Sequence, residues 1–327
     1  MRKIIAYTRV SKPVIEELKL QFDVSYFENY EYLESAKFRK ALEEAEGIIG
    51  LELKVTKELL ELAPNLKIVS NVSVGYDNLD LPEMTKRKIM ATNTPGVLTD
   101  TVADAVVGML IASARRIPEL DRFVKEGRWK EYLQLNQFGI DVHHKKIGII
   151  GMGAIGQAVA KRCHYGFDMK ILYYNRSRKP EVENRYGAVF HNLEDLLKES
   201  DFVVLMIPSS RETKHFIRTE HFKKMKTSAI FVNASRGMNI DEHALYNALK
   251  NNEILAAALD VFEKEPVGAD NPLLSLQNVI TLPHLGAATI ENELAMSRLA
   301  QQNLVRGLNN EIPPNIINQE IINDDDI

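Results

Sequence analysis

The chain has 327 residues, 45% of them hydrophobic and 26% charged, and a formal net charge of −4. A single hydrophobic core stops growing at about 250–300 residues, so this length predicts two domains. The balance of charge, without a basic patch, argues against nucleic acid as a partner. The apolar stretch from Ala105 to Ala114 is shorter than the roughly 18 residues of a membrane span. The first residues resemble a strand rather than a signal peptide, so we expect a cytoplasmic protein without a membrane partner.

The first 98 residues alternate between short apolar runs and helical patterns. Continuous apolar runs are typical of strands in a parallel sheet that is buried on both faces. No glycine fingerprint follows any of them, which predicts a second, smaller α/β domain. The expected strands are Ile4–Tyr7, Val24–Phe27, Gly47–Leu51, Ile68–Asn71 and Ile89–Thr92.

A long helical pattern follows this half of the chain. It starts at Thr99, continues from Asp100 to about Glu126, and stops at Gly127. Its surface is rich in alanine, valine and methionine, which suits packing between domains or subunits. Together with the family resemblance described below, this surface leads us to expect a homodimer.

The alternation of strands and helices resumes at residue 145. Helical patterns such as Leu193–Glu199 and Glu242–Lys250 separate most of the strands. A last helix, Glu291–Leu308, precedes a polar tail that we expect to fray. The six expected strands are Ile147–Ile150, Lys170–Tyr174, Phe202–Ile207, Ala229–Asn233, Ile254–Leu259 and Val279–Leu282.

The first of these strands ends in a Gly-x-Gly-x-x-Gly turn, followed by an apolar-periodic helix. Gly151 permits a tight turn, Gly153 lets the backbone approach a pyrophosphate, and Gly156 lets the helix pack close to the strand. The free N–H groups of the helix then face the anion. A second strand, Met169 to Tyr174, completes the pattern. The turn therefore predicts a dinucleotide site, and six strands beginning with such a turn predict a doubly wound α/β fold.

Polar residues follow the last three strands. In an open parallel sheet, ligands bind outside the carboxyl ends of the strands. Arg236 follows the fourth strand, Glu265 the fifth and His284 the sixth. A histidine beside a carboxylate is a candidate proton donor, because the carboxylate favours the protonated imidazolium. An arginine there can anchor a substrate carboxylate.

The other histidines and the single cysteine have simpler interpretations. His215 lies in the loop after the third strand and has no obvious acidic partner, and His191 is expected to cap the helix at Leu193. We expect Cys163 to be a buried, inert thiol, and we expect no metal site. The remaining histidines fall before the first strand or in helices, and they are His143, His144, His164, His221 and His243.

Taken together, the motifs resemble those of the D-isomer-specific 2-hydroxyacid dehydrogenase family. The similarity spans nearly the whole chain, and the branch that it resembles most contains the glyoxylate/hydroxypyruvate reductases and the 2-ketogluconate reductases. The segments that carry it are Ser73–Asn78, Asn93–Thr99, Gly151–Gly156, Asn233–Gly237, Leu259–Pro266 and Pro283–His284.

This resemblance implies a catalytic set of Arg236, Glu265 and His284. Glu263 is the rival carboxylate in the same loop, but the family pattern places the glutamate just before the proline, which favours Glu265. The resemblance also implies that a Rossmann domain, residues 99–287, is inserted into a flavodoxin-like substrate domain made of residues 1–98 and 288–327.

The expected ligand contacts come from both domains. The backbone amides near Val74 and Gly75 are expected to hold the substrate carboxylate with Arg236, and Lys54 either touches the substrate or is a solvated surface lysine. The residues expected to bind the cofactor are Gly151, Gly153, Ala154, Ile155, Gly156, Asn175, Arg176, Ser177, Arg178, Pro208, Thr213, Ala234, Ser235 and Asp260.

The loop after the second strand predicts which cofactor is used. An NAD-binding chain usually carries a carboxylate there, bonded to the ribose. Here the loop reads Asn175-Arg176-Ser177-Arg178-Lys179, without an acid. Its arginines could bind a 2′-phosphate. We therefore expect a preference for NADP(H), with NAD(H) as the alternative.

The sequence thus predicts an NAD(P)H-dependent reductase of small 2-keto acids, namely glyoxylate, hydroxypyruvate or 2-ketogluconate. One alternative is an enzyme like D-3-phosphoglycerate dehydrogenase, although there is no spare regulatory domain. Formate dehydrogenases of the superfamily carry a glutamine at the position of Glu265. The alternative from another class is a nucleotide-sensing, corepressor-like binding protein. The acid-free cofactor loop and the lack of a disordered extension argue against it.

Overall fold

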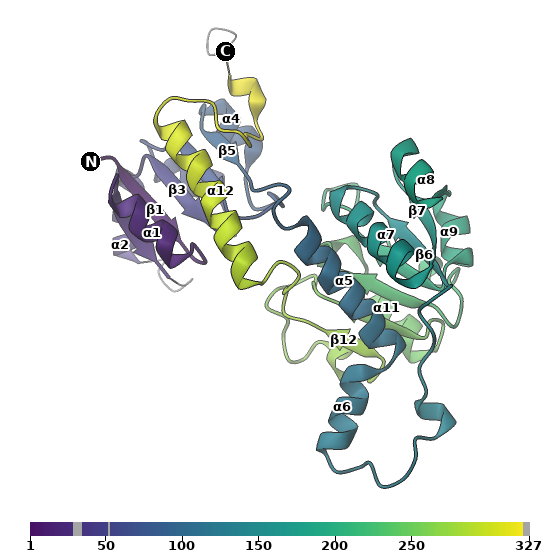
Figure 1. Cartoon of the computed structure of the whole chain (residues 1–327). Coiled ribbons are helices and arrows are strands. Elements are labelled where there is room, and N and C mark those ends of the chain that lie inside the picture. Colours follow the sequence, from purple (N-terminus) through teal and green to yellow (C-terminus); the bar gives the residue numbers. More distant parts are fainter. Residues whose placement is uncertain (29–34, 52, 323–327) are drawn as a thin grey trace. The chain divides into compact units, whose positions relative to one another are not determined.

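The chain divides into two compact units in the computed structural model, which describes residues 1–28, 35–51 and 53–322 (Figure 1). Unit 1 comprises residues 1–98 and 288–327, and unit 2 comprises residues 99–287. The chain therefore leaves unit 1 after its first 98 residues, builds unit 2, and then returns. The end of the polar tail, residues 323–327, lies outside the described residues.

Unit 1 is built on five parallel strands in the order β2-β1-β3-β4-β5. This is the flavodoxin-like order, so the predicted fold of this half is confirmed. All five expected strands are present, with ends shifted by one residue at most. The elements are β1 (Lys3–Tyr7), α1 (Lys12–Lys19), β2 (Asp23–Phe27), α2 (Ala36–Glu44), β3 (Gly47–Gly50), α3 (Lys57–Glu61), β4 (Ile68–Asn71), α4 (Leu81–Lys86), β5 (Met90–Thr92), α12 (Ile290–Leu308) and the 3-10 helix η5 (Gln319–Ile321).

The C-terminal helix α12 packs on the sheet of unit 1 (Figure 1). It contacts β3, β4 and β5 and lies beside α1. Its buried residues include Met296, Ala300 and Leu304. Gly307 allows the last turn to approach the sheet, because a Cβ there would lie 2.5 Å from the Ile68 side chain. The two ends of the chain thus share one hydrophobic core.

Unit 2 is built on seven parallel strands in the order β12-β11-β10-β9-β6-β7-β8. The order runs outward in both directions from β6, as in a doubly wound Rossmann sheet, so this predicted fold is confirmed. All six expected strands are present. The seventh, β8 (Val189–Phe190), was not expected, because two partly exposed residues at a sheet edge are too few to show a periodic pattern.

The remaining elements of unit 2 cover the sheet or connect its strands. The strands are β6 (Lys146–Ile150), β7 (Lys170–Tyr174), β9 (Phe202–Leu205), β10 (Ile230–Asn233), β11 (Ala256–Leu259) and β12 (Val279–Thr281). The helices are α5 (Thr99–Ala114), α6 (Ile117–Lys125), η2 (Leu135–Gln137), α7 (Ala154–Phe167), α8 (Pro180–Tyr186), α9 (Leu193–Glu199), α10 (Thr219–Phe222), η3 (Gly237–Asn239), α11 (Glu242–Lys250) and η4 (Pro272–Ser275).

The single long helix expected from Asp100 to Glu126 is wrong, because the structure has α5 and α6 there. Arg116, between the two helices, has a φ of +55°. Pro118 follows, and a proline has no N–H to donate to the carbonyl four residues earlier. That carbonyl, on Ala114, instead accepts a 2.8 Å hydrogen bond from the Ile140 amide. The break is therefore built into the sequence by the proline.

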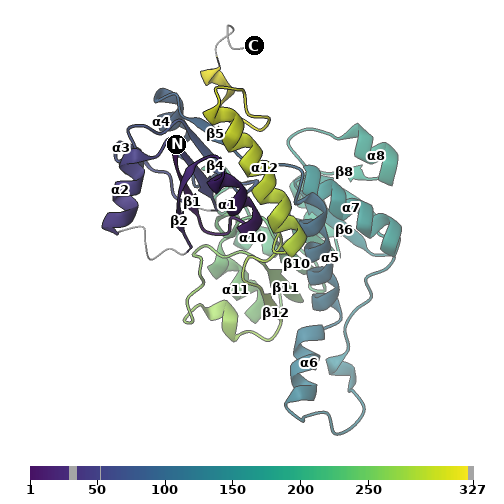
Figure 2. The same cartoon turned by 60° about the vertical axis from the view of Figure 1, so that its left-hand side comes forward.

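Most of the apolar surface of α5 is used inside unit 2. The helix lies beside α7 and also contacts β10 and β11 (Figure 2). Val106 and Leu110 are fully buried there. By contrast, α6 has no buried residue. Seven of the exposed large apolar side chains of unit 2 are therefore on α6 and the segment after it, and none is on α5.

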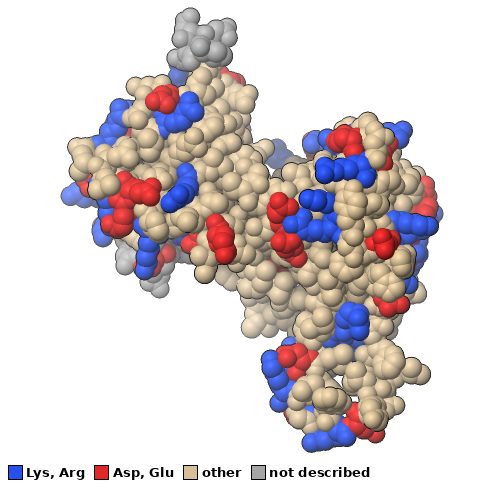
Figure 3. All heavy atoms as spheres, in the orientation of Figure 1, with Lys and Arg blue, Asp and Glu red and all other residues tan. Residues whose placement is uncertain are grey.

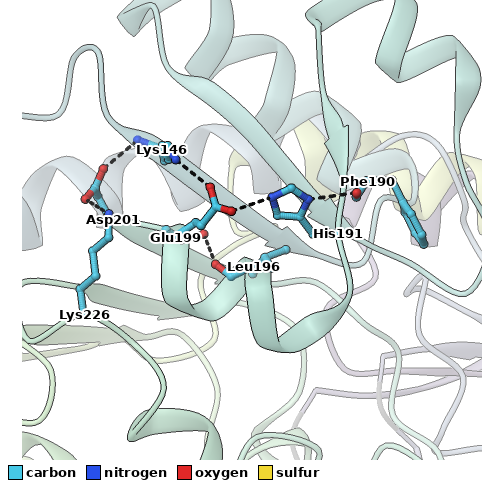
Figure 4. Close-up of polar contacts among 8 residues, drawn as sticks. Lys146, Phe190, His191, Leu196, Glu199, Asp201 and Lys226 are labelled. Carbon is cyan, nitrogen blue, oxygen red and sulfur yellow. Dashed lines mark hydrogen bonds and ion pairs between the residues drawn. The ribbon is translucent and has the colours of Figure 1, made fainter.

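Ion pairs brace the amino edge of the unit 2 sheet (Figure 4). Lys146 Nζ lies 2.7 Å from Glu199, which also lies 3.5 Å from His191. Asp201 accepts a 2.9 Å hydrogen bond from the Lys146 amide and pairs with Lys226 at 2.7 Å. The expected capping role of His191 is wrong: the following Asn192 caps α9 by accepting from the Asp195 amide. His191 therefore belongs to this brace.

The surface of the molecule carries both signs of charge. Lysine and arginine side chains alternate with acidic ones over the face shown in Figure 3. None of the helices in the described ranges combines the length and the apolar character that a membrane crossing requires.

Candidate active site

Three neighbouring strands end at one edge of the unit 2 sheet. β10 pairs with β11 and β11 with β12, all in parallel. Their carboxyl ends therefore meet at one edge, which is where ligands bind in such sheets. The loops that follow carry Arg236, Glu265 and His284, respectively. The structure thus assembles on adjacent strands three residues that are up to 48 positions apart in the chain (284 − 236).

His284 and Glu265 form a direct hydrogen bond. The Nδ1 atom of His284 lies 2.7 Å from Oε2 of Glu265. The other oxygen, Oε1, accepts a 2.8 Å hydrogen bond from the Phe262 amide. Burial raises the pKa of the Glu265 carboxyl, but these hydrogen bonds and the charges of His284 and Arg236 outweigh it and leave the pKa below its ordinary value. Glu265 is therefore a carboxylate that holds the Nδ1 side of the imidazole.

A buried carboxylate fixes the turn that carries His284. Asp260 is 2% exposed, and its two oxygens accept hydrogen bonds of 2.7 and 2.8 Å from the amides of Leu285 and Gly286. Burial is the main reason why the pKa of Asp260 is raised, and the two amides oppose the shift. His284 itself has a φ of +54°, in the left-handed region. The amide contacts of Asp260 thus stabilise an unfavourable backbone conformation at the histidine.

The turn after β10 holds Arg236 through a network of buried amides. Asn233 donates a 3.1 Å hydrogen bond to the carbonyl of Arg236 and accepts from both the amide and the hydroxyl of Ser235. Asn239 donates to Ser235 Oγ and to the carbonyl of Ile207. Arg236 donates to the Ser235 carbonyl at 2.9 Å. Ser235, expected at the cofactor, is thus engaged within this turn.

The glycine turn after β6 has the geometry of an anion cradle. Gly151 has a φ of +103°, and a Cβ there would lie 2.6 Å from the Met206 carbonyl oxygen. A Cβ on Gly156 would lie 2.2 Å from the Gly151 carbonyl oxygen, whereas one on Gly153 would meet no atom within 4 Å. Gly153 is also the N-cap of α7, and it has no side chain to bond to the first amides of the helix. Ala154 and Ile155 contribute these amides. An anion can therefore approach the helix N-terminus over Gly153.

Comparisons with known proteins identify the family. Residues 107–286 match the sequence model of the NAD binding domain of D-isomer specific 2-hydroxyacid dehydrogenases. The chain belongs to the D-isomer specific 2-hydroxyacid dehydrogenase family. Residues 107–286 are therefore its domain for a nicotinamide cofactor, and the resemblance to this family is confirmed.

Relatives and solved structures match nearly the whole chain. A probable 2-ketogluconate reductase of Dictyostelium discoideum is 45% identical over 322 residues, which cover 98% of this chain and 96% of the relative. Glyoxylate/hydroxypyruvate reductase B of Klebsiella pneumoniae is 44% identical, covering 97% and 98%. The crystal structure of an NADPH-dependent glyoxylate/hydroxypyruvate reductase from Sinorhizobium meliloti, in complex with NADP and malonate, has a TM-score of 0.85 at 30% identity and covers 97% of each chain.

The loop after β7 carries two arginines, and their contacts in this dehydrogenase differ. Arg178 makes two hydrogen bonds to Glu183, of 3.0 and 2.6 Å, and Glu183 also accepts from Tyr173. Arg176 is exposed and forms no ion pair within the described part of the chain. Asn175 donates to the Ser177 carbonyl, which shapes the loop. Of the two, Arg176 is thus the arginine that no acid neutralises in the described residues.

The loop after β9 is closed by its own hydrogen bonds. Thr213 Oγ1 donates to the Pro208 carbonyl at 2.9 Å and accepts from the Ser210 amide at 2.7 Å. Thr213 and Pro208 thus fix one loop at the carboxyl edge of the sheet. Ala234, also expected at the cofactor, follows the neighbouring strand β10 at the same edge.

Within unit 1, the expected substrate residues follow β3 and β4. The carbonyls of Val74 and Gly75 accept 2.8 Å hydrogen bonds from Asn93 and Asn71. Their amides donate no hydrogen bond within the described residues, so this turn offers donors to an anion. Lys54 is exposed, and no acidic partner for it occurs in the described ranges.

Several residues that hold this edge together were not expected from the sequence. Asn233 and Asn239 are fully buried, and His215, interpreted as lacking an acidic partner, lies 3.2 Å from Glu263. The pair comes from distant loops, so local sequence could not show it. No group of histidine, cysteine and acidic side chains in the described residues could hold a metal ion.

We predict different effects for alanine at two glycines of the cradle. Gly156→Ala places a Cβ against the Gly151 carbonyl and should lower the melting temperature. Gly153→Ala meets open space, so the melting temperature should stay near that of the wild type while the Kd for the dinucleotide rises. Thermal unfolding and cofactor titration measure both effects. Tight dinucleotide binding by Gly153→Ala would contradict the assignment of the cradle.

Proposed function

We propose that this dehydrogenase reduces a small 2-keto acid, namely glyoxylate, hydroxypyruvate or 2-ketogluconate, to the D-2-hydroxy acid. The observation that carries the proposal is the 2.7 Å hydrogen bond between His284 and Glu265, at the edge that also carries Arg236. A keto acid has a carbonyl oxygen that is protonated on reduction and a carboxylate that needs a cation. A proton donor beside an anion-binding arginine suits both groups. The names of the relatives support the same class of substrate.

His284 supplies the proton in this reaction. When bound, the nicotinamide cofactor supplies the hydride that adds to the keto carbon. Nδ1 of His284 is engaged by Glu265, so Nε2 is the nitrogen that donates the proton to the developing alkoxide. Glu265 keeps the ring protonated and oriented, because a neighbouring negative charge favours the imidazolium.

Arg236 and the turn at Val74 and Gly75 are the proposed contacts of the substrate carboxylate. A guanidinium can bind a carboxylate through two parallel hydrogen bonds, and it polarises a carbonyl nearby. The unbonded amides of Val74 and Gly75 are suited to the same anion. Lys54 remains a proposed contact of the far end of the substrate, and its replacement by methionine should raise KM for the longest keto acid most.

We further propose that the enzyme prefers NADPH. A 2′-phosphate needs cations, and the loop after β7 offers Arg176 without a competing carboxylate. Arg178 is already paired with Glu183, so it contributes less to binding. The NADPH-dependent relative from Sinorhizobium meliloti supports this choice.

We also propose that the protein is a homodimer. Seven large apolar side chains between residues 117 and 138, on α6 and the segment after it, are exposed. Figure 2 shows that this part of the chain projects from the rest of unit 2. Tyr132 is 93% exposed and Leu135 is 83% exposed. Clustered apolar groups of this kind mark protein interfaces, and a second copy of the chain is the proposed occupant. The members are Ile117, Val124, Trp129, Tyr132, Leu133, Leu135 and Phe138.

A cytoplasmic location is part of the same proposal. Cys163 is a buried free thiol on α7, and burial raises its pKa to about 12. A buried thiol of this kind is unreactive and has a structural role. Free thiols are typical of proteins in reducing compartments such as the cytoplasm. Reduction of keto acids with NADPH also fits a compartment that holds the reduced cofactor.

The first prediction concerns the proton donor. His284→Gln should lower kcat by about 10²–10⁴-fold while NADPH binding is retained, because only the general acid is lost. In the wild type, kcat/KM for reduction should fall as the pH rises and the imidazolium deprotonates. Steady-state rates with NADPH and the three keto acids measure both effects. A protein that binds NADPH but turns over none of them would instead be a corepressor-like sensor, and turnover of a phosphorylated hydroxy acid alone would favour the phosphoglycerate dehydrogenase alternative.

The second prediction concerns the cofactor. Arg176→Ala should lower the ratio of kcat/KM for NADPH to that for NADH by about 10–100-fold, since a charge-assisted bond contributes roughly 1.5–3 kcal/mol. Arg178→Ala is the matched control and should change the ratio much less. If the two variants shift the ratio equally, or if the wild type prefers NADH, Arg176 does not read the phosphate.

The third prediction concerns the dimer. Replacing Tyr132 and Leu135 together by aspartate should convert a species of twice the 37.1 kDa chain mass into a monomer, because two charges cannot be buried in an apolar interface. Leu20→Asp, at an equally exposed leucine of unit 1, is the control. Light scattering after gel filtration gives the mass. A wild-type monomer would contradict the proposal.

A further inference from the structure

We propose that Glu263 is a positioning residue, whose carboxylate ties together the two loops that carry Arg236 and Glu265. The inference rests on the proposed function, because it concerns the same site. The sequence left Glu263 as the rival of Glu265 for the partner of the histidine. Its contacts assign it another task.

Glu263 and Glu242 exchange hydrogen bonds with each other's backbone. The Glu242 amide donates to Glu263 Oε1 at 3.1 Å, and the Glu263 amide donates to Glu242 Oε1 at 2.6 Å. Glu242 is the first residue of α11, so its amide has no partner within the helix. Asn271 donates to the second oxygen of Glu242 at 2.8 Å. The loop after β11 is thus fastened to the N-terminus of α11 from both sides.

The mutual hydrogen bonds of Glu263 and Glu242 form a clamp. A third loop joins this clamp through His215. Its Nε2 atom lies 3.2 Å from Oε1 of Glu263. That nitrogen is shielded from solvent and forms no well-directed hydrogen bond in the described residues, so its polar contact is the one with the Glu263 carboxylate. The His215 backbone is held by a 2.8 Å hydrogen bond from its amide to the Met238 carbonyl, although its φ is +49°. Glu263 therefore meets the loop after β9 as well.

The clamp reaches Arg236 through direct backbone packing. A Cβ on Gly237 would lie 1.8 Å from the Phe262 carbonyl carbon and 2.3 Å from the Glu263 amide nitrogen. The peptide next to Arg236 therefore rests on the peptide of Glu263, with no room for a side chain between them. A shift of the Glu263 backbone must move one or both loops.

The clamp reaches Glu265 along the chain. Glu265 follows Glu263 by two residues, and Phe262, which precedes Glu263, donates to Glu265 Oε1. The amide of Phe262 and the side chain of His284 thus both hold Glu265, and Glu263 holds the segment that supplies the amide. The carboxylate of Glu263 is used by Glu242 and His215, so the two glutamates of this loop have different partners.

The inference is tested with Glu263→Ala and Glu263→Gln. The alanine leaves the Glu242 amide and His215 without a partner, so kcat should fall by about 10–100-fold, the cost of a small misplacement of reacting groups. The Kd for NADPH should stay close to that of the wild type. Glutamine keeps an acceptor oxygen for the Glu242 amide, so it should recover most of the lost kcat. Glu253→Ala, in the turn before β11 at the opposite edge of the sheet, is the matched control and should leave kcat unchanged.

Hydrogen exchange gives a readout that does not depend on turnover. In Glu263→Ala, the amides of residues 236–240 and 260–265 should exchange faster than in the wild type and in Glu253→Ala. Faster exchange in a protein that reduces no keto acid would uphold the clamp and reject the proposed function. If the wild type is active and Glu263→Ala matches Glu253→Ala in kcat and in exchange, the inference is wrong. A loss of kcat that glutamine does not recover, with unchanged exchange, would also reject the positioning role.

Discussion

Parallel pairing of β10, β11 and β12 is the constraint on which the rest of the site depends. Because the strands run in the same direction and in register, their carboxyl ends lie side by side. Arg236, Glu265 and His284 therefore converge although helices and loops separate them in the chain. The same edge receives the glycine turn after β6. A slip of one strand would displace its loop from the other two. The packing of the buried apolar strands therefore fixes the relative positions of the three side chains.

The loops at this edge are held by carboxylates with separate partners. Asp260 accepts from the two amides after His284, Glu265 binds the imidazole, and Glu263 bonds to α11. A buried or half-buried charge is costly unless donors surround it, so each of these contacts offsets the desolvation of its own carboxylate. The opposite directions of the pKa shifts follow: burial dominates at Asp260, whereas the charges and donors around Glu265 prevail over burial. Separate partners allow three acids in one loop to act differently.

The opposite edge of the same sheet shows what a purely structural network looks like. Lys146, Glu199, Asp201 and Lys226 pair with one another there (Figure 4). Each of these acids has a lysine close by and a low pKa: burial raises that of Asp201, and the Lys146 amide and Lys226 outweigh it, while Lys146 lowers that of Glu199. The carboxyl edge adds to such pairs the open glycine turn at Gly153 and the hydrogen bond between His284 and Glu265, which is why we place the chemistry there.

The sequence by itself determined the two α/β folds, eleven of the twelve strands in the described residues, the glycine turn, and the placing of Arg236, Glu265 and His284 after three strands of one sheet, because all of these follow from local patterns. The choice of Glu265 over Glu263 came from the family resemblance. The proline that divides α5 from α6 was also local, but the carbonyl of Ala114 finds its replacement donor in Ile140, which only the fold supplies. Tertiary structure likewise decided that Arg178 is neutralised by Glu183 while Arg176 is not, and that Glu263 meets His215. Side-chain pairing depends on distances that the folded backbone sets, and a sequence pattern contains no such distances.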